Sequence, residues 1–243
     1  MLREEWIVPV LRVNNRSVNQ EFLEKTIGLK TQLEDGPFAE FGGQGTKAVR
    51  LVLQESPSMR TRAVKGPKKL QKLVIKVQNP SEIEGLLARG SQFAKLYKGQ
   101  LGYGFEAVSP EGDTFLVHGE ASQADLVEIL PPVAFEAAEG FQGLTEFVVE
   151  EIILRTPQVA VSQAFYRSIL PDQSILTFEE AEGADLLTVA EEVWDLDSLR
   201  FAVAADFEWA GLEEKLPAGY FKDKKEQFIQ TVDPSGIELW FEK

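Results

Sequence analysis

Residues 11–22, LRVNNRSVNQEF, are echoed by residues 154–165, LRTPQVAVSQAF. Leu, Arg, Val, Gln and Phe recur in both stretches at one constant separation along the chain. A second echo follows later in each copy, where the turn Ser-Pro-Glu-Gly at 109–112 is matched by Asp-Pro-Ser-Gly at 233–236. Two matched stretches in the same order indicate an internal repeat, and a repeat decides the fold before any single element does.

Around the first echoed stretch, the sequence predicts a series of short elements. Ile7–Val13 is apolar and precedes an Asn-Asn turn signal, which is typical of a strand. Residues 17–28 predict a helix, since Ser17 can cap it, apolar residues recur at helical spacing and Gly28 ends it. A further short helix is predicted at 79–90. Further strands are predicted at 29–33, 38–41, 48–54, 70–77, 105–108 and 114–117.

The second copy predicts a similar order of elements. Helices are expected at 159–170 and 207–215, and strands at 147–155, 174–179, 185–190, 198–203, 227–232 and 237–242. We therefore predict an α+β protein of tandem βαβββ modules, with curled mixed sheets and flanking helices. The modules are expected at 1–128 and 146–243, with a linker at 129–145 that contains Pro131-Pro132. A pocket is expected on the concave face of a curled sheet.

The composition excludes several function classes. The chain has 243 residues, no Cys and a single His, so disulfides, thiolate chemistry and a three-histidine zinc site are excluded. Its formal net charge of −14 argues against nucleic-acid binding, which needs cations that displace counterions. No apolar run reaches the roughly 20 residues of a membrane span. The acidic residues near Met1 do not suit a signal peptide, so we expect a cytoplasmic protein.

The echoed motifs resemble those of a known superfamily. A strand ending in Leu-Arg-Val, a helix with Phe near its middle, a following Gly-Leu and a closing Asp-Pro-x-Gly hairpin are similar to the vicinal oxygen chelate proteins, which include glyoxalases, bleomycin-resistance proteins and dioxygenases. The whole chain resembles the streptococcal CppA family, whose members are labelled complement component 3 degrading proteinase. This resemblance implies the glyoxalase-like fold and, through the label, proteolysis with complement component 3 as a partner.

In that superfamily, inward-facing strand residues hold a divalent metal ion. Carried over one at a time, the positions fall on Val8, Lys72, Leu116, Glu151, Ser198 and Trp240. Only one of these is a good ligand, whereas a divalent ion needs several carboxylate or imidazole groups. We therefore expect no metal site and no cofactor.

A proteinase needs an activated nucleophile or an activated water. The sequence contains neither a His-Glu-x-x-His run nor a Gly-x-Ser-x-Gly elbow. A Ser-His-Asp triad would have to use His118, which is our one candidate catalytic residue. The alternative is a partly exposed histidine at a strand end with no catalytic role, and an unspecific serine–lysine pair also stays open.

Positively charged and aromatic residues indicate a ligand site. Residues 60–72 carry six Lys and Arg and no acid, which suits either an anionic ligand or a solvated loop. Lys72 is expected to point into the curled sheet, and Tyr103 lies between two glycines, either as a lip over a pocket or packed against the linker. The predicted ligand-binding residues are Arg12, Arg50, Lys72 and Tyr103.

Three functions follow from these observations. The first is a metal-free protein that binds a small anionic molecule or a protein partner, with its pocket in the N-terminal module. The second is the proteinase that the family label implies. The third is a pure interaction protein whose modules pair edge to edge, with a homodimer as one form.

Overall fold

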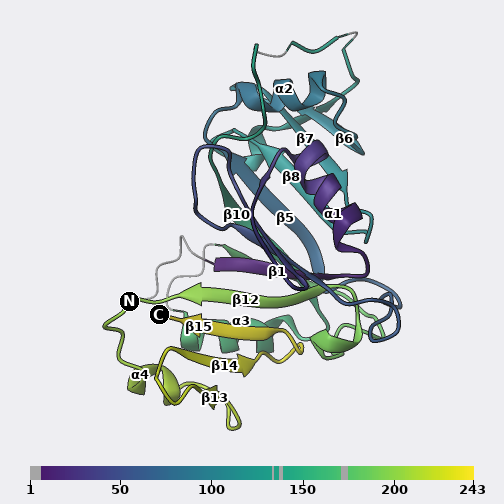
Figure 1. Ribbon diagram of the computed structural model, residues 1–243. Helices are drawn as coiled ribbons and strands as arrows, with labels where there is room; N and C mark the ends of the chain where they lie inside the picture. Colours follow the sequence, from purple (N-terminus) through teal and green to yellow (C-terminus); the bar gives the residue numbers. More distant parts are fainter. Residues whose placement is uncertain (1–6, 133, 137–138, 171–174) are drawn as a thin grey trace.

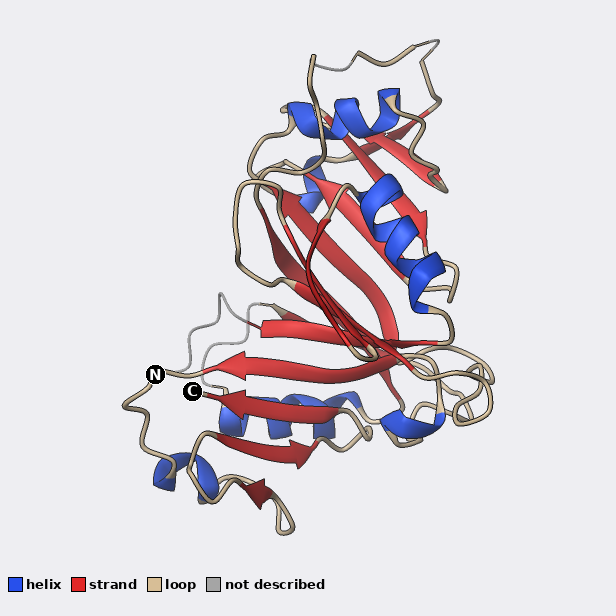
Figure 2. Cartoon of the chain, in the orientation of Figure 1, coloured by secondary structure: helices blue, strands red, loops and turns tan. Residues whose placement is uncertain are grey.

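The structure, a computed structural model, describes residues 7–132, 134–136, 139–170 and 175–243. In these residues the chain forms two mixed β-sheets with helices beside them, so the predicted α+β class is confirmed. In Figure 1, β5, β7, β8 and β10 lie in the upper part of the molecule and β12, β14 and β15 in the lower part, and Figure 2 separates strands from helices by colour.

The first sheet has eight strands in the order β13-β14-β15-β12-β1-β4-β3-β2. These are β1 (Ile7–Val13), β2 (Lys30–Asp35), β3 (Phe38–Gly42), β4 (Leu51–Glu55), β12 (Leu196–Ala202), β13 (Phe221–Lys222), β14 (Phe228–Val232) and β15 (Glu238–Glu242). Its two halves meet where β1 pairs antiparallel with β12, and Val8 lies opposite Arg200 there. One sheet is thus built from both ends of the chain.

The second sheet has seven strands in the order β11-β10-β5-β8-β7-β6-β9. These are β5 (Leu70–Val77), β6 (Lys95–Lys98), β7 (Tyr103–Val108), β8 (Thr114–His118), β9 (Val127–Ile129), β10 (Phe147–Thr156) and β11 (Leu176–Glu180). Here β5 pairs antiparallel with β10 along most of its length. This sheet also joins the two halves of the chain.

The order of elements shows successive βαβββ units, as the repeat predicts. The units are β1-α1-β2-β3-β4, β5-α2-β6-β7-β8 and β12-α4-β13-β14-β15, while β10-α3-β11 carries one strand after its helix. The helices are α1 (Arg16–Phe22), α2 (Ser81–Ala88), α3 (Val159–Ile169) and α4 (Ala210–Glu213), with a π-helix η2 (Leu23–Ile27) continuing α1. Short 3₁₀ turns lie at η3 (Gln123–Asp125) and η4 (Ala190–Glu192).

The structure corrects how the units combine. The first unit pairs with the last, and the second pairs with the third, so neither sheet belongs to one half of the chain. The predicted division into 1–128 and 146–243 therefore does not separate the two sheets, and as a division into folding units it remains a prediction. The linker predicted at 129–145 overlaps β9 at Ile129 and includes residues outside the described part of the chain.

Several element predictions were wrong in detail. The strand predicted at 185–190 is a run of turns, and the helix predicted at 207–215 shortens to α4. The predicted strand 174–179 corresponds to β11, although residue 174 lies outside the described residues. The short strands β6, β9 and β13 were missed, because runs of two to four residues carry little periodicity.

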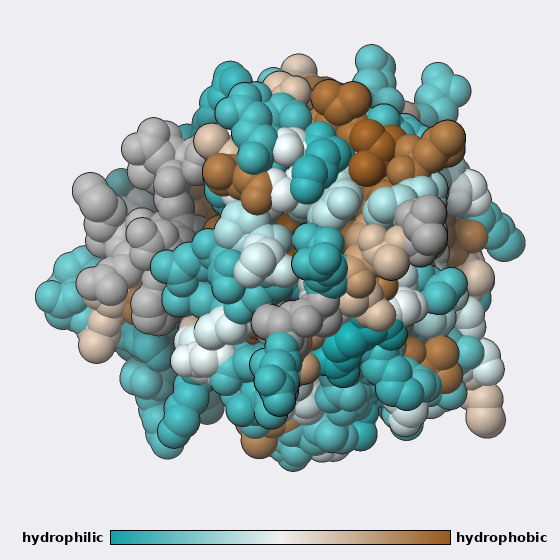
Figure 3. All heavy atoms as spheres, turned by 90° about the horizontal axis from the view of Figure 1, so that it is seen from above, coloured by the Kyte–Doolittle hydropathy of each residue, from teal (hydrophilic) through white to brown (hydrophobic). Residues whose placement is uncertain are grey.

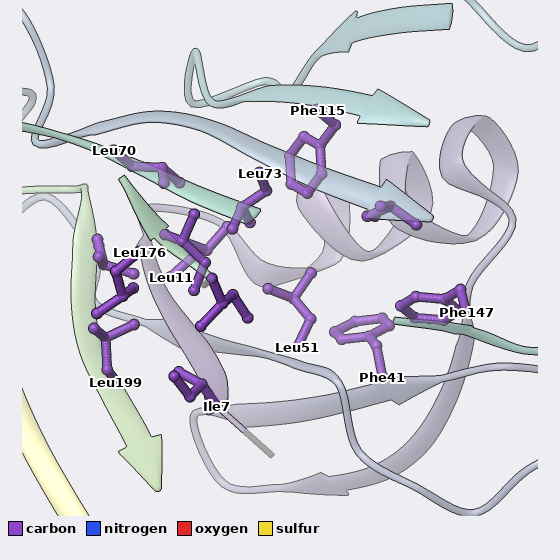
Figure 4. Close-up of a cluster of buried hydrophobic side chains, with 14 of the residues drawn as sticks. Ile7, Leu11, Phe41, Leu51, Leu70, Leu73, Phe115, Phe147, Leu176 and Leu199 are labelled. Carbon is purple, nitrogen blue, oxygen red and sulfur yellow. The ribbon is translucent and has the colours of Figure 1, made fainter. Parts of the chain in front are cut away.

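One continuous apolar core lies between the two sheets. It includes Leu11 and Leu51 from the first sheet, Leu73 and Phe115 from the second, and Phe147 from β10, all at most 2% exposed. Figure 4 shows these side chains pointing toward one another. Because successive strand residues point to opposite faces, the alternate residues of each strand must lie on the outer faces of the two sheets.

The outer surface is mostly polar. In Figure 3, which views the molecule from above, hydrophilic side chains cover most of the visible face and apolar groups interrupt it in patches. Val127 in the edge strand β9 and Leu130 directly after it are exposed apolar residues. Within the described residues, every helix is too short or too polar to cross a membrane.

Candidate functional site

A pocket of about 340 Å³ lies on the outer face of the first sheet. Its lining comes from β1, β3, β4, β12, β15 and the loop before β4, namely Val8, Glu40, Ala48, Val49, Arg50, Val52, Arg200, Ala202 and Glu242. Five of these side chains are apolar, and four are charged. Residues far apart in sequence thus line one hollow, which both halves of the chain must build together.

Strand alternation explains why these residues face outward. Leu199 and Phe201 on β12 are buried in the core, so Arg200 between them points to the opposite face. The same alternation on β15 buries Leu239 and Phe241 and leaves Glu242 outside. The register places Ala202 beside Glu242 and Trp240 beside Arg200 on the neighbouring parallel strands.

The curl of the sheet brings charges from distant strands together. Glu40 lies on β3 and Glu242 on β15, with β12, β1 and β4 between them in the sheet. Burial raises the pKa of Glu242 above its usual value, Arg200 opposes that rise, and the charge of Glu40 adds to it. The two carboxylates therefore act on each other across the hollow rather than at opposite edges of a flat sheet.

Arg200 is the cation best placed to meet a ligand. Its guanidinium lies 5.7 Å from the centre of the Phe38 ring. Its Nε atom is buried, and among the described residues no acceptor lies within hydrogen-bonding distance of it. A guanidinium is a group that can bind a carboxylate or a phosphate, and leaving one of its buried N–H groups without an acceptor costs free energy.

Arg50, a predicted site residue, also lines this pocket. Its backbone N–H donates to the carbonyl of Phe41 at 2.8 Å, which fixes the residue beside the end of β3. Arg50 and Arg200 therefore supply two guanidinium groups to one hollow, one from each half of the chain.

Arg12, another predicted site residue, is held in a buried ion pair. Its Nε donates to Asp197 at 2.8 Å, and both side chains are nearly inaccessible. Burial raises the pKa of Asp197, while Arg12 lowers it. The pair joins β1 to β12 and is not part of the pocket lining, so it supports the sheet beneath the pocket.

Lys72 lies on the other sheet, apart from the two arginines. Its Nζ contacts Glu106 Oε2 at 2.7 Å, so Lys72 forms a salt bridge on its strand, and its predicted role in ligand binding remains a prediction. Residues 119–126 run along this face: Lys76 Nζ donates to the Ala121 carbonyl at 3.3 Å, and Gln123 donates to Glu151 at 2.8 Å. At the place where the sequence predicted a pocket around Lys72, the structure therefore has the Lys72–Glu106 ion pair, and residues 119–126 contact the same sheet.

Tyr103 packs against the linker, as the alternative interpretation predicts. Its ring meets Phe135 edge to face with centres 5.4 Å apart, and Lys98 Nζ lies 3.8 Å from its ring centre. The four predicted ligand-binding residues therefore occupy different places, and only Arg50 lines the pocket described above.

His118, the candidate catalytic residue, is completely buried rather than partly exposed. Its Nε2 lies 2.8 Å from Glu150 Oε2, and Lys76 holds the other oxygen of the same carboxylate at 2.8 Å. A general base must reach the substrate proton, and a buried imidazole does not. The structure gives this residue no exposed catalytic face, so the proteinase implied by the family label stays a prediction.

Three cations of the basic run at 60–72 join parts of the fold, whereas Arg60 and Lys65 are exposed. Arg62 forms a two-pronged ion pair with Asp185, at 2.6 and 2.8 Å, and holds the pKa of that carboxyl well below its usual range. Lys68 pairs with Asp113, and Lys69 is fully buried with a pKa lowered by that burial. Arg62, Lys68 and Lys69, which the sequence suggested for an anionic ligand, are therefore engaged in contacts within the fold.

The metal positions of the superfamily are divided between the two sheets. Val8, Ser198 and Trp240 lie on the first sheet, whereas Lys72, Leu116 and Glu151 lie on the second. Neither set offers several carboxylate or imidazole donors, so these residues do not fit a divalent ion. Within the described residues, no three His, Cys, Asp or Glu side chains cluster as a metal site would require.

Sequence reasoning missed three charged residues of the pocket, Glu40, Arg200 and Glu242. A signal was present, because each is a charged residue that alternates with buried apolar residues on its strand. The sequence does not reveal that the first unit pairs with the last. Only this pairing brings the three residues into one pocket.

Comparisons with known proteins agree with this architecture. The sequence model described as "CppA N-terminal" matches residues 6–129, and the one described as "CppA C-terminal" matches residues 144–241. Among curated proteins, no sequence matches the chain.

Solved structures show the same fold over nearly the whole chain. The crystal structure of cppA protein from Streptococcus pneumoniae TIGR4 is 40% identical, with a TM-score of 0.88 over 97% of this chain and 96% of that one. Glyoxalase I from Zea mays is 12% identical, with a TM-score of 0.59 over 97% of this chain and 91% of that one. A putative dioxygenase from Bacillus subtilis subsp. subtilis str. 168 is 12% identical, with a TM-score of 0.59 over 100% and 86%. The predicted glyoxalase-like fold is confirmed.

Proposed function

This chain belongs to the CppA family, and from that premise we propose that it binds a small anionic molecule, without a metal ion, in the pocket on the first sheet. The observation that carries the proposal is the guanidinium of Arg200, whose buried Nε has no acceptor among the described residues. The fold offers a pocket, and the side chains decide what the pocket takes.

The pocket has the character of a ligand site. Its volume of about 340 Å³ is at the small end of the range of roughly 300–1,000 Å³ typical of ligand pockets. Apolar side chains such as Val8, Val49 and Val52 line it and reduce the screening of charge by water. A guanidinium in that setting can bind a carboxylate or a phosphate with paired hydrogen bonds.

The proposed site differs from the one predicted from the sequence. The prediction placed the pocket inside the N-terminal module near Lys72. The pocket proposed here takes Val8, Glu40 and Arg50 from the N-terminal half and Arg200 and Glu242 from the C-terminal half. A small ligand at this place would contact both halves at once and would stabilise their association.

A thermal-shift series with carboxylates and phosphate esters of increasing apolar size tests this proposal. We expect at least one probe to raise the Tm of the wild-type protein by several degrees near 100 times its Kd, since such binding adds about 2.7 kcal/mol to the free energy of unfolding. Arg200→Met should abolish the shift. Arg167→Met, which changes an exposed arginine on α3, should preserve it. A flat response of the wild type, or an unchanged shift in the Arg200 variant, contradicts the proposal.

A further inference from the structure

The pocket carries both signs of charge in equal number. Arg50 and Arg200 provide two cations, and Glu40 and Glu242 provide two carboxylates. Their formal charges cancel when all four are ionised. Two acids in the lining would weaken the binding of a simple anion, because their negative charges repel it in a partly desolvated site.

Arg200 does not form a closed ion pair with either acid of the pocket. Among the described residues, neither Glu40 nor Glu242 has a salt bridge to Arg200, and the buried Nε of Arg200 has no acceptor. Other charged residues of the two sheets do form salt bridges, as in Arg12–Asp197 and Lys72–Glu106. Arg200, Glu40 and Glu242 thus line one pocket without a salt bridge from the arginine to either acid.

The positive and negative side chains of the pocket lie close enough for one small molecule to contact both. Arg200 and Glu242 are on neighbouring parallel strands, where Ala202 pairs with Glu242 and Trp240 with Arg200. Strands in a sheet lie roughly 4.8 Å apart and rise about 3.3 Å per residue, so the two Cα atoms are diagonal neighbours about 8 Å apart. Glu40 lines the same pocket, and its charge raises the pKa of Glu242.

The rest of the lining is apolar. Val8, Ala48, Val49, Val52 and Ala202 complete the pocket, and none of them offers a polar side-chain atom. A ligand that fits must therefore bring an anionic group, a cationic group and an apolar body within about 340 Å³.

Resting on the proposed function, we propose that the ligand is a small zwitterion with an apolar side chain, of the size and chemistry of an aliphatic amino acid. Its carboxylate lies at Arg200, with Arg50 nearby. Its ammonium group lies at Glu242 and Glu40, and its side chain lies against the valines. A single molecule of this kind offers a carboxylate to the arginine and an ammonium group to the two acids.

Three probes of matched shape separate this inference from the proposed function. Leucine carries both charges, 4-methylpentanoate carries only the carboxylate, and 3-methylbutylamine carries only the amine. Isothermal titration calorimetry should give leucine a Kd at least tenfold lower than either singly charged probe. Arg200→Met should weaken leucine and 4-methylpentanoate together, whereas Glu242→Gln should weaken leucine and leave 4-methylpentanoate bound as well as before or better.

Proton exchange on binding gives a second, independent readout. Burial raises the pKa of Glu242, and Arg200 and Glu40 are the charges that act on it, with Arg50 also in the lining. An ammonium group beside Glu242 would lower that pKa, so leucine should release protons from the protein where Glu242 is partly protonated, which a titration series at several pH values locates. A carboxylate alone would raise it and cause proton uptake. Titrations in buffers of different ionisation enthalpy measure the sign, and Glu242→Gln should remove the effect.

Each outcome decides something. If 4-methylpentanoate binds as tightly as leucine, or leucine binding takes up protons, the zwitterion inference is wrong while the anion pocket stands. If none of the three probes binds and no anion shifts the Tm of the wild type, both proposals are wrong. If 3-methylbutylamine alone binds, the acids rather than Arg200 are the binding groups, and both proposals are likewise overturned.

Discussion

At the scale of single residues, buried acids organise the C-terminal half. Asp233 Oδ1 accepts the backbone N–H groups of Ser235 and Ile237, each at 2.8 Å, and its Oδ2 accepts the hydroxyl of Tyr166 at 3.0 Å. The repeated turn seen in the sequence is therefore a hydrogen-bonded junction between the β14–β15 hairpin and α3. Burial is the main cause of the raised pKa of Asp233.

This residue makes stability depend on pH in a definite direction. Because its folded-state pKa lies above the ordinary value, the folded protein binds the proton more tightly than the unfolded chain. Its contribution to stability is complete below the unfolded-state pKa and is lost as the pH rises through the raised folded-state value. In Asp233→Asn this contribution is absent, so the free energy of unfolding of the variant, relative to wild type, should increase from pH 4 toward pH 7.

Urea unfolding at several pH values measures this difference. Asp195 and Asp197, whose pKa values burial also raises, titrate in both proteins and cancel in the comparison. The exposed Asp206→Asn serves as the control and should follow the wild-type profile. Parallel profiles of the wild type and Asp233→Asn would contradict the assignment of a raised pKa to this residue.

The charged residues also show what sequence could predict at this scale. The strand position of Lys72 was predictable, because it follows from the local apolar pattern of residues 70–77, whereas its partner Glu106 was not. The partners Asp185, Asp113 and Asp195 of the basic run were not, because each pair joins segments that only the completed fold brings together. The complete burial of His118 likewise follows from packing across sheets, which no local pattern records.

At the scale of elements, close backbone approach fixes the loop before β4. The N–H groups of Gln44 and Gly45 donate to the carbonyls of Leu144 and Thr145 at 2.8 and 2.9 Å. A Cβ atom at Gly43 would lie 2.3 Å from the carbonyl oxygen of Thr145, which no flexible side chain can relieve. This loop carries Ala48, Val49 and Arg50 into the pocket, so its anchoring also positions the site.

Gly43→Ala should therefore lower the free energy of unfolding by about 1–3 kcal/mol, as overpacking does. Gly211→Ala is the matched control, because Gly211 lies within α4 and a Cβ there would meet nothing within 4 Å. That change should be neutral or should stabilise by up to about 1 kcal/mol, since alanine favours a helix over glycine. Urea denaturation of both variants measures the contrast. Equal effects of the two substitutions would show that the approach of residue 145 does not constrain this loop.

The element predictions succeeded where periodicity is long and failed where packing decides. β1, β5 and α3 were predicted nearly in full, because their apolar residues repeat over seven or more positions. Residues 185–190 were predicted as a strand from the repeated order of elements, yet they form turns in which Asp185 pairs with Arg62 and accepts the Lys65 N–H at 2.6 Å. A tertiary ion pair overrides local propensity there.

At the scale of the whole molecule, the repeat was predictable and its pairing was not. A βαβββ unit exposes an apolar face that any other unit can cover. The same sequence pattern is therefore compatible with pairing between neighbouring units and with pairing between the first and last units. The structure pairs the first with the last and the second with the third. The pocket exists only because of this choice, since β1 and β12 meet within it.

The same pairing predicts that neither half of the chain folds alone. Residues 1–132 without the rest would expose the free edges of β1 and β5, which β12 and β10 cover in the full chain. Produced separately, residues 1–132 and 139–243 should be aggregated or unfolded by circular dichroism and size-exclusion chromatography. Produced together, they should form a one-to-one complex with the spectrum of the intact protein.

Trp194 reports on this assembly directly. Its Nε1 donates to the carbonyl of Ser56 at 2.8 Å, so a tryptophan of the C-terminal half is bound to the N-terminal half. In the intact chain, tryptophan fluorescence and far-ultraviolet circular dichroism should therefore report one common unfolding transition in urea. Trp194→Phe keeps most of the apolar surface and removes the hydrogen bond, so it should destabilise the protein by about 1 kcal/mol without separating the transitions. Two resolved transitions, or a folded monomer from either half alone, would mean that the sheets do not depend on both halves.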